Sequence, residues 1–517
     1  MKINPFIITA IIALSAVTNS CRDDEFLVSQ PLDSYIADEF YNSDTQVIAS
    51  TNHLYGKAWF NYYNKAVWAI TEMGAGNAFS YSSDITSFKT FDVFSTNERL
   101  SEAWKSNFAV IAQSNALMNN LAVNAGANVT VTVKNNAIAE ARLMRAVAYF
   151  NLVRLWGPVP IIEDNTTVAS NPKINTNPIA DVYKFIENDL IFASENLVSK
   201  VRGSNYAANG HVSKGTANAL LAKVYLYEKK YDLAKAKAQE VINSGEFKLY
   251  GGSSLPTKSY ADLFLTANNN NEESILAIQW AVTGVYGTGN NCNTQFAYSS
   301  LINASTFGGV FAPSMDLINN GYVTGDLRRK ETFMLPNDHY SNILSSQGGF
   351  TVPTTINAQN TGSGIKKYVV GKATDSHGGA DEWGMMANNT YLMRYADLLL
   401  IYAEATMGVS NNTADATAVS VFNQVRNRAG LPSVTNFTKA DLFQERRKEF
   451  AFEAEYWFDL GRLPKSEAIS ILSAQNRGDA STPVYYTPTE SDLMMPYPDA
   501  EVAKNPKLLE TPVPYQF

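Results

Sequence analysis

The sequence predicts an all-α protein, a tetratricopeptide-like helical superhelix joined to a large irregular half, with only minor short strands. Three observations support this. Residues 140–160 form a helix that is apolar on most of its surface, residues 221–241 repeat the spacing of a helix–turn–helix unit, and residues 251–390 lack a sustained period. So apolar a helix must pack against other helices. An apolar share of 45% gives the 517 residues ample core.

The first twenty residues predict an export signal. Lys2 precedes an apolar run over 7–17 that is too short to span a bilayer, and small polar residues lead to Cys21. This arrangement resembles a bacterial lipobox, so we expect residues 1–20 to be a lipoprotein signal peptide and Cys21 to be lipidated. A secretory signal with an incidental cysteine is the alternative. No later stretch reaches 18 apolar residues, so we expect an anchored chain that does not cross the membrane.

The N-terminal half alternates helices with one irregular segment. Asp44 is the expected cap of the first helix. Residues 74–100 are rich in glycine, serine and aromatic residues, so we expect no regular element there. Helices are expected over 101–121 and 180–199, on either side of the 140–160 helix.

A repeat follows these helices. One stretch has nearly the spacing of a tetratricopeptide repeat, a helix–turn–helix of 34 residues. Its small residues let two helices approach, and a second, less regular unit runs over 395–430. The residues of the first unit are Leu221, Ala222, Tyr225, Tyr231, Ala234, Ala238 and Val241.

Residues 251–390 interrupt the helical pattern. Within them 273–280 predicts a short strand, and 335–390 is rich in glycine, serine, asparagine and threonine. So long an irregular region in a compact protein is usually functional or disordered. A charged helix is then expected over 442–462, before an extended, proline-rich end.

The charged residues near the end of the chain suggest either catalysis or an ion-pair network. We favour a partly buried network in which Arg394, Arg426 or Arg428 neutralises the glutamates. Arg145 is expected to pair with Glu140 or Asp397 in the same way. Asp326 and Arg328 are interpreted as a structural turn. The charged set is Glu445, Arg446, Arg447, Glu449, Glu453, Asp459 and Arg462.

Several functions lack support in the sequence. The net charge of −8 and the absence of a Lys/Arg cluster argue against a nucleic-acid partner. No HExxH, P-loop, GxSxG or zinc-spaced Cys/His pattern is present, so we expect no catalytic residues, cofactor or metal. A glycoside hydrolase needs only two suitably spaced carboxylates, so that alternative stays open.

Seven segments together resemble the SusD/RagB family of outer-membrane nutrient-binding lipoproteins, and they follow the family's order over nearly the whole chain. Residues 22–25, Arg-Asp-Asp-Glu, resemble the acidic signal that sends Bacteroidetes lipoproteins to the cell surface. Pro496-Tyr497-Pro498 departs from the family's usual proline–isoleucine–proline. The matching segments are 21–31 (CRDDEFLVSQP), 140–160 (EARLMRAVAYFNLVRLWGPVP), 211–250, 394–405 (RYADLLLIYAEA), 423–431 (NQVRNRAGL), 445–462 (ERRKEFAFEAEYWFDLGR) and 495–508 (MPYPDAEVAKNPKL).

The resemblance implies one SusD-like domain over 21–517, with a helical part at 22–250 and a part at 251–517 that holds the irregular insert. It implies four tetratricopeptide-like units and an irregular, ligand-facing half. It also implies a partner, a SusC-like TonB-dependent transporter of the outer membrane. Family members bind oligosaccharides most often, and some bind peptides, so a non-catalytic glycan-uptake lipoprotein on the cell surface is expected.

Aromatic residues in the irregular segments are the candidate ligand contacts. Sugars stack on flat aromatic rings, while amides and charged groups bind their hydroxyls. Trp280 lies at the end of an apolar strand, so we favour a core position over a ligand contact for it. Tyr81, Tyr286 and Trp383 have polar or glycine neighbours, so binding and packing are equally plausible for them. The candidates are Asn77, Phe79, Tyr81 and Phe88 in the first stretch, Trp280, Tyr286 and Asn290 in the second, and Trp383 in the third.

Two other functions stay open alongside glycan uptake. A RagB-like peptide-binding lipoprotein would keep the fold and the transporter but would need a less aromatic groove. A tetratricopeptide-type scaffold for protein partners would bury the loop aromatics and have no concave polar site.

Overall fold

The computed structural model describes residues 40–202, 210–303, 308–375 and 384–517. The predicted signal peptide, Cys21 and Trp383 lie outside these ranges. No helix within them combines the length and hydropathy that a membrane span requires.

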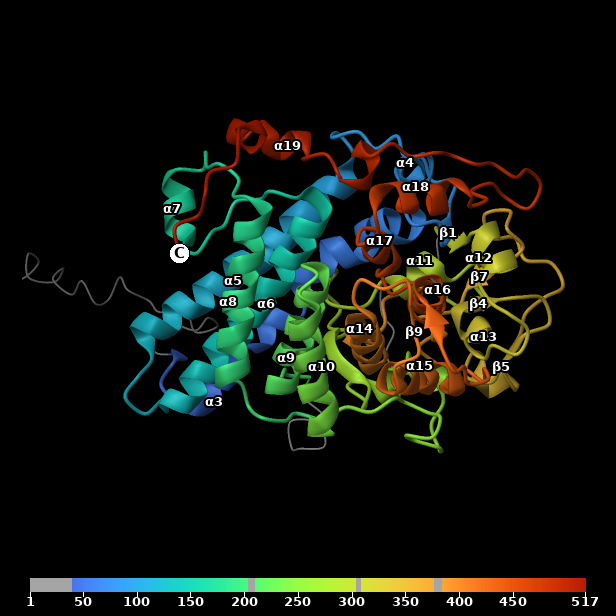
Figure 1. Ribbon diagram of the computed structural model, residues 1–517, viewed down its shortest axis with the longest axis horizontal. Helices are drawn as coiled ribbons and strands as arrows, with labels where there is room; N and C mark the ends of the chain where they lie inside the picture. The colour runs from blue at the N-terminus through green and yellow to red at the C-terminus, as the bar shows by residue number, and fades with distance from the viewer. Residues whose placement is uncertain (1–39, 203–209, 304–307, 376–383) are drawn as a thin grey trace, which may run out of the picture.

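Long helices form one half of the molecule, and each packs against its neighbour in a continuous array (Figure 1). The predicted helical superhelix is confirmed, and the 395–430 unit extends it. The helices in order are α5 (Glu98–Asn124), α6 (Val131–Trp156), α8 (Ile179–Asn196), α9 (Lys214–Tyr227), α10 (Tyr231–Ser244), α14 (Tyr395–Met407), α15 (Ala416–Arg428) and α16 (Lys439–Phe450).

Local sequence explains where the helices of the array begin and end. Thr130 caps α6 by accepting a hydrogen bond from the Val133 amide, and Gly157 ends it at a φ of 74°. α9 begins with a capping box, and α10 ends at Gly245 with a φ of 62°. Ala234 on α10 is fully buried, as the predicted close approach of α9 and α10 requires.

The chain before this array is made of short turns. Ser43, not Asp44, caps the first helix, because its hydroxyl accepts from the Gln46 amide. Asp44 instead accepts from the Thr130 amide at 2.7 Å. The elements are α3 (Asp44–Ser50), the 3₁₀ turns η1 (Asn52–Tyr55) and η2 (Lys57–Trp59), the π-helical turns η3 (Tyr62–Ala66) and η4 (Trp68–Met73), and α4 (Thr86–Thr90).

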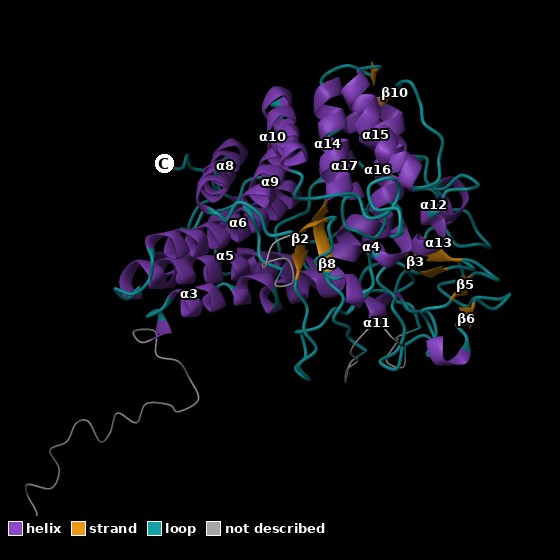
Figure 2. Ribbon diagram, turned by 90° about the horizontal axis from the view of Figure 1, so that it is seen from below, coloured by secondary structure: helices purple, strands orange, loops and turns teal. Residues whose placement is uncertain are grey.

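Short antiparallel strand pairs and brief helices form the other half, where loops predominate (Figure 2). The strand predicted at 273–280 is β2. The pairs in this half are β1 (Ala78–Phe79) with β3 (Ala312–Pro313), β2 (Ser274–Ile278) with β8 (Thr390–Arg394), β4 (Phe333–Met334) with β7 (Gly364–Ile365), and β5 (His339–Tyr340) with β6 (Phe350–Thr351). A further pair, β9 (Asn412–Thr413) with β10 (Phe437–Thr438), lies in the helical array instead, where β9 joins α14 to α15 and β10 precedes α16 (Figure 2).

Brief helices and 3₁₀ turns connect these strands and cover the array. The helices are α7 (Asn165–Ser170), α11 (Cys292–Phe296), α12 (Met315–Asn320), α13 (Arg328–Thr332), α17 (Tyr456–Leu460), α18 (Lys465–Ser473) and α19 (Asp499–Val502). The turns are η5 (Tyr260–Asp262), η6 (Thr266–Asn268), η7 (Ser345–Gln347), η8 (Ser491–Leu493) and η9 (Pro506–Leu509).

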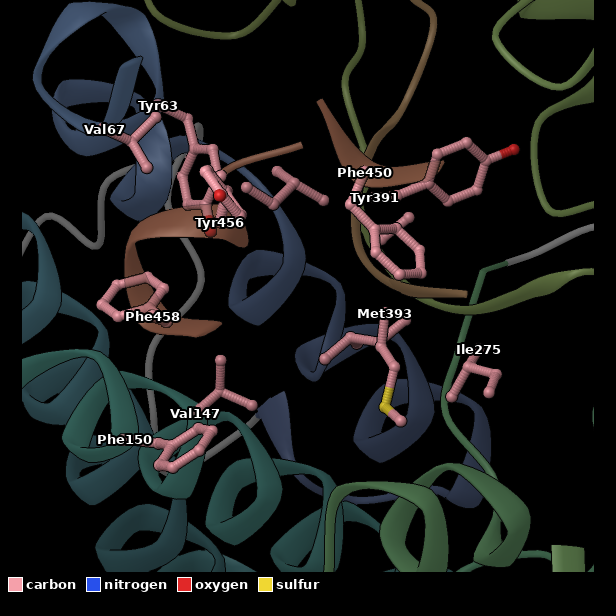
Figure 3. Packing of buried hydrophobic residues seen from close by; sticks show 14 of the residues in the cluster. Tyr63, Val67, Val147, Phe150, Ile275, Tyr391, Met393, Phe450, Tyr456 and Phe458 are labelled. Atoms are coloured by element: carbon pink, nitrogen blue, oxygen red, sulfur yellow. The ribbon is translucent and has the colours of Figure 1, made fainter. Parts of the chain in front are cut away.

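One hydrophobic cluster joins the two halves. Figure 3 shows Phe150 of α6 and Phe458 of α17 on facing elements, with Met393 of β8 in the same cluster. The guanidinium of Arg154 lies 3.8 Å from the ring centre of Phe150 and 3.8 Å from that of Phe458. This half-buried cation interacts with two aromatic faces. Trp104, Trp156 and Trp457, which we assign to the core from the sequence, are buried.

A buried ion network fastens the irregular half to the last helices of the array. Arg394, at the end of β8, binds Glu449 of α16 at 3.0 Å and Glu273 at a shorter distance. Arg428 of α15 binds the same two glutamates, at 2.7 Å for Glu273. Arg328 joins them, 3.1 Å from Glu449. The predicted structural network is confirmed, and Arg394 and Arg428 are among its cations as expected.

One prediction about this region was wrong. No single helix spans 442–462, because α16 ends at Phe450 and the chain then turns through Phe452 and Ala454, whose φ values are 62° and 65°. The structural turn expected at Asp326 and Arg328 is present, because the Asp326 amide donates to the Val323 carbonyl at 3.1 Å, and both side chains are buried in the ion network.

The predicted partners of Arg145 were also wrong. Arg145 pairs with Asp189 of α8 at 2.8 Å. Glu140 binds His211 at 2.8 Å, and Asp397 binds Lys223 at 2.9 Å. Helix packing selected the partner among several carboxylates.

Candidate functional site

Tyr81 stands on the surface of the irregular half, just after β1. Its side chain is 55% exposed, whereas Phe79, two residues earlier, is buried. The two rings meet edge to face with their centres 4.9 Å apart. The ammonium of Lys89 lies 4.2 Å from the ring centre of Phe79 and 5.6 Å from that of Tyr81. Tyr81 therefore projects from a packed aromatic base.

Hydrogen bonds hold Tyr81 at its amide and at its hydroxyl. The amide donates to Gln359 Oε1 at 2.8 Å, and the hydroxyl donates to the carboxylate of Asp479. Asn360 Nδ2 donates to the same carboxylate at 2.8 Å. The hydrogen bond to Asp479 raises the pKa of Tyr81, and the bonds from Tyr81, Asn360 and Ser481 hold the pKa of Asp479 well below its usual range.

The segment under Tyr81 has an unusual backbone. Gln359 and Asn360 have φ values of 51° and 54°, in the left-handed region that few non-glycine residues adopt. Gln359 also donates from Nε2 to the Gly309 carbonyl at 2.8 Å. Surrounding contacts hold such strain in place, and it is common at functional sites.

Side chains from distant segments donate hydrogen bonds to the backbone carbonyls of residues 73–76, which precede Tyr81 in the chain. Arg477 donates to the carbonyls of residues 73 and 74 at 3.0 and 2.9 Å. Gln475 donates to that of residue 75 at 2.9 Å, and Ser314 to that of residue 76 at 2.6 Å. Burial lowers the pKa of Arg477 to about 9, so the guanidinium is still charged at neutral pH. This segment is a fixed support for Tyr81.

Tyr286 is the second exposed ring, with a side chain that is 52% exposed. Its ring meets Phe60 edge to face at 5.0 Å, and Phe60 in turn meets the buried Trp280 at 6.1 Å. Asn64 Nδ2 donates to the Tyr286 hydroxyl at 3.4 Å. Tyr286 is therefore fixed at its ring and at its hydroxyl, as Tyr81 is.

One turn, η3, contacts the segments of both tyrosines. Asn64 reaches Tyr286 and also accepts from Gln295 Nε2 at 3.2 Å. The next residue, Lys65, binds Asp84 at 2.8 Å. Burial alone would raise the pKa of Asp84, but the hydrogen bonds from Lys65 and Ser82 and the charges of Lys65 and Arg99 together outweigh it, so the pKa is lowered. We call the surface made by Asn64, Tyr81, Tyr286, Gln359 and Asp479 the aromatic face.

Two polar atoms beside this face lack a hydrogen-bond partner within the described structure. They are Gln295 Oε1 and the Tyr298 hydroxyl. Burial raises the pKa of Tyr298 to about 12, so its hydroxyl stays protonated and can donate. Buried polar atoms are usually paired, and an unpaired one needs an explanation such as a ligand or a water.

The other predicted ligand residues lie inside the protein. Trp280 donates from its indole to Thr390 at 2.9 Å, and Asn290 donates to the Asn388 carbonyl at 2.7 Å. Asn77 donates to Glu72 at 3.0 Å and accepts from Arg447. Because their surfaces are covered and their polar atoms are bonded, we do not place them at the aromatic face. The buried set is Asn77, Phe79, Phe88, Trp280 and Asn290.

Sequence reasoning missed Asn64, Gln359, Asp479 and Arg477. Asp479 carries a local signal, because it accepts from the Ser481 and Thr482 amides in an Asx turn. That signal predicts a turn but not the contact with Tyr81, which lies almost four hundred residues earlier.

The aromatic face is an open surface. Neither Tyr81 nor Tyr286 lines any of five cavities found in the described part of the chain. Among the described residues, no group of three or more His, Cys, Asp or Glu side chains is placed to hold a metal ion.

Comparisons with known proteins cover nearly the whole chain. Residues 249–513 match a family model described as the SusD family, and residues 33–226 match one described as starch-binding associating with outer membrane. A SusD-like protein of Bacteroides ovatus is 34% identical over 98% of both chains.

Solved structures agree with this result. A crystal structure with xylogluco-oligosaccharide has a TM-score of 0.80 and 32% identity, and it covers 91% of this chain and 99% of that one. A laminarin binding SusD-like protein has a TM-score of 0.70 and 26% identity, and it covers 91% of this chain and all of that one.

Proposed function

The chain belongs to the SusD family of carbohydrate-binding proteins, and we propose that its aromatic face captures oligosaccharides for uptake without changing them covalently. The observation that supports this site is the pair of exposed, hydrogen-bonded rings, Tyr81 and Tyr286. Solvent-exposed rings that are held this firmly are hard to justify by packing alone.

The chemistry of the face suits a pyranose chain. The apolar side of a sugar ring stacks on a tyrosine ring, and both rings are already oriented, so little side-chain entropy is lost on binding. Asn64, Gln359 and Asp479 supply amide and carboxylate groups for sugar hydroxyls.

The relatives suggest which glycans to test first. Xyloglucan and laminarin, the sources of the ligands in the names of two similar structures, both have backbones of β-linked glucose. We therefore place β-glucans at the head of the ligand panel.

The proposed setting is the outer membrane of a Bacteroidetes-type cell. Cys21 would carry the lipid anchor after removal of residues 1–20, and residues 21–517 would act as one unit with a SusC-like TonB-dependent transporter. Several buried acyl chains hold a protein on a membrane almost permanently. Cys21→Ser should therefore move the protein from the membrane fraction to the soluble fraction, and an unchanged distribution would contradict this anchor.

Binding is tested on the mature protein, residues 22–517, by affinity electrophoresis and calorimetry with xyloglucan, laminarin and casein-type peptides. Tyr81→Ala and Tyr286→Ala should each weaken glycan binding about 5- to 10-fold, the value of one stacked ring, with an unchanged melting temperature. Tyr485→Ala, which removes an exposed tyrosine outside this face, is the control.

The other outcomes distinguish the alternatives. Binding to peptides alone would replace the glycan proposal with peptide uptake, and no binding to any ligand would favour the scaffold. An increase in reducing ends during incubation with the glycan would indicate hydrolysis and would contradict a purely binding role.

A further inference from the structure

A cavity lies apart from the aromatic face, among η5, α13 and the C-terminal end of α15. Its volume is about 910 Å³, within the range of small-ligand sites. It is named here the Tyr322 cleft, after its partly exposed tyrosine. None of its lining residues belongs to the aromatic face.

The floor of the Tyr322 cleft is charged but internally neutralised. Arg428 lies there and binds Glu273 and Glu449, and Asp326 binds Arg328 at 2.8 Å. The floor therefore adds little net charge. However, the Nε–H of Arg428 has no hydrogen-bond partner within the described structure, although the side chain is buried. This enclosed donor suits a buried water.

Two more charged residues of the wall already have partners. Arg329 binds Asp338, and Glu331 lies 3.8 Å from Lys366. Each of these two pairs joins one cation to one anion, so neither adds net charge to the cleft.

The two lysines of the cleft differ from these groups. Neither Lys258 nor Lys330 has a carboxylate within 4 Å in the described part of the chain, and both line the cleft. Their ammonium groups lie 5.6 Å from the ring centre of Tyr250 and 5.3 Å from that of Tyr340. The cleft therefore carries two lysines that form no ion pair in the described structure, and their positive charges attract an anion.

Apolar surface lies beside these charges. Leu327 is 62% exposed on the rim, and Tyr322 presents part of its ring. The Tyr322 hydroxyl donates to the Lys448 carbonyl at 2.7 Å, which fixes the orientation of the ring. A ligand that combines a flat apolar side with a carboxylate matches both features.

We propose that the Tyr322 cleft binds a uronic acid residue of an acidic oligosaccharide, with Lys258 and Lys330 on the carboxylate and Tyr322 against the pyranose ring. The choice of a saccharide rests on the proposed function, but the site is separate from the aromatic face. The protein would thus hold neutral and acidic sugar residues at different places.

The test is calorimetry of residues 22–517 with trigalacturonate and with its methyl-ester form, which has the same rings without charge. Lys258→Gln combined with Lys330→Gln should weaken trigalacturonate binding about 10-fold or more. Wild-type affinity should fall as sodium chloride rises from about 50 to about 300 mM, because salt screens the charges. The affinity of the wild type for the methyl ester should not exceed the affinity of the Lys258→Gln, Lys330→Gln double variant for trigalacturonate.

The matched control is Lys173→Gln with Lys214→Gln, which removes two exposed lysines that also lack a carboxylate within 4 Å in the described structure. It gives the same net charge and should bind like the wild type. No binding of the acid, equal binding of acid and ester, or equal loss in both double variants would overturn the Tyr322 cleft as a uronate site. Xyloglucan and laminarin binding, measured on the same samples, tests the aromatic face independently.

Discussion

The helical array and the irregular half are stabilised in different ways. Helices such as α9 bury apolar stripes against their neighbours, so regular spacing along the sequence specifies their contacts. The segment that carries Tyr81 instead depends on Arg477, Gln475 and Ser314, whose side chains bind its backbone carbonyls. The comparison shows that the surface most suited to binding is built from long-range polar contacts, on a scaffold built from repeating apolar ones.

The largest expected effect is at the ion network that joins the two regions. Arg394→Met leaves Glu273 and Glu449 with less compensation in the interior, so we expect the free energy of unfolding to fall by about 3–5 kcal/mol. Urea unfolding, monitored by circular dichroism, measures this free energy. Lys465→Met, which breaks an exposed pair with Glu490, should cost less than about 1 kcal/mol. Equal losses in the two variants would contradict this role of the network.

A core residue of the helical array should affect stability alone. Leu221 of α9 is fully buried, so Leu221→Ala should lower the free energy of unfolding by about 2–5 kcal/mol. Calorimetry on the folded variant should give the wild-type affinity for the glycan, because α9 does not carry the aromatic face. A large loss of affinity would mean that the two regions are coupled more closely than their contacts indicate.

A residue of the irregular half should show the reverse pattern. Asp479→Asn keeps the side-chain oxygen that accepts from the Ser481 amide but replaces the oxygen that accepts from Tyr81. We expect glycan affinity to fall about 5-fold, the value of one hydrogen bond, with little change in melting temperature. Asp492→Asn, a similar turn residue that binds Thr489, is the control and should bind like the wild type. An unchanged affinity for Asp479→Asn would remove Asp479 from the site.

The last expected effect concerns pH. Burial raises the pKa of Glu102, on α5, to about 7. The folded state then binds a proton that the unfolded state has released, so this group lowers stability as pH rises from about 4.3 to about 7. Unfolding free energies at pH of about 5 and about 7.5 should therefore differ less in Glu102→Gln than in the wild type. Glu98→Gln, whose side chain is 76% exposed, should keep the wild-type difference.

The sequence predicted the parts of the site that depend on local pattern. Glycine and polar neighbours indicated Tyr81 and Tyr286, and both are exposed. The same composition also indicated Phe79 and Asn77, which are buried. Composition marks an irregular segment but does not say which of its side chains point outward, since that depends on elements far away in the chain.

The sequence by itself determined the helical array, the family and the structural role of the late charged cluster, because periodic apolar stripes and local caps act within a few turns of helix. Only the tertiary structure decided that Arg145 pairs with Asp189, that the helix after Phe450 breaks, and that Asp479 meets Tyr81. Each of these depends on which surfaces meet in space. The chain contains several carboxylates that could pair with the same arginine, and the packing of the helices determines which one lies within reach.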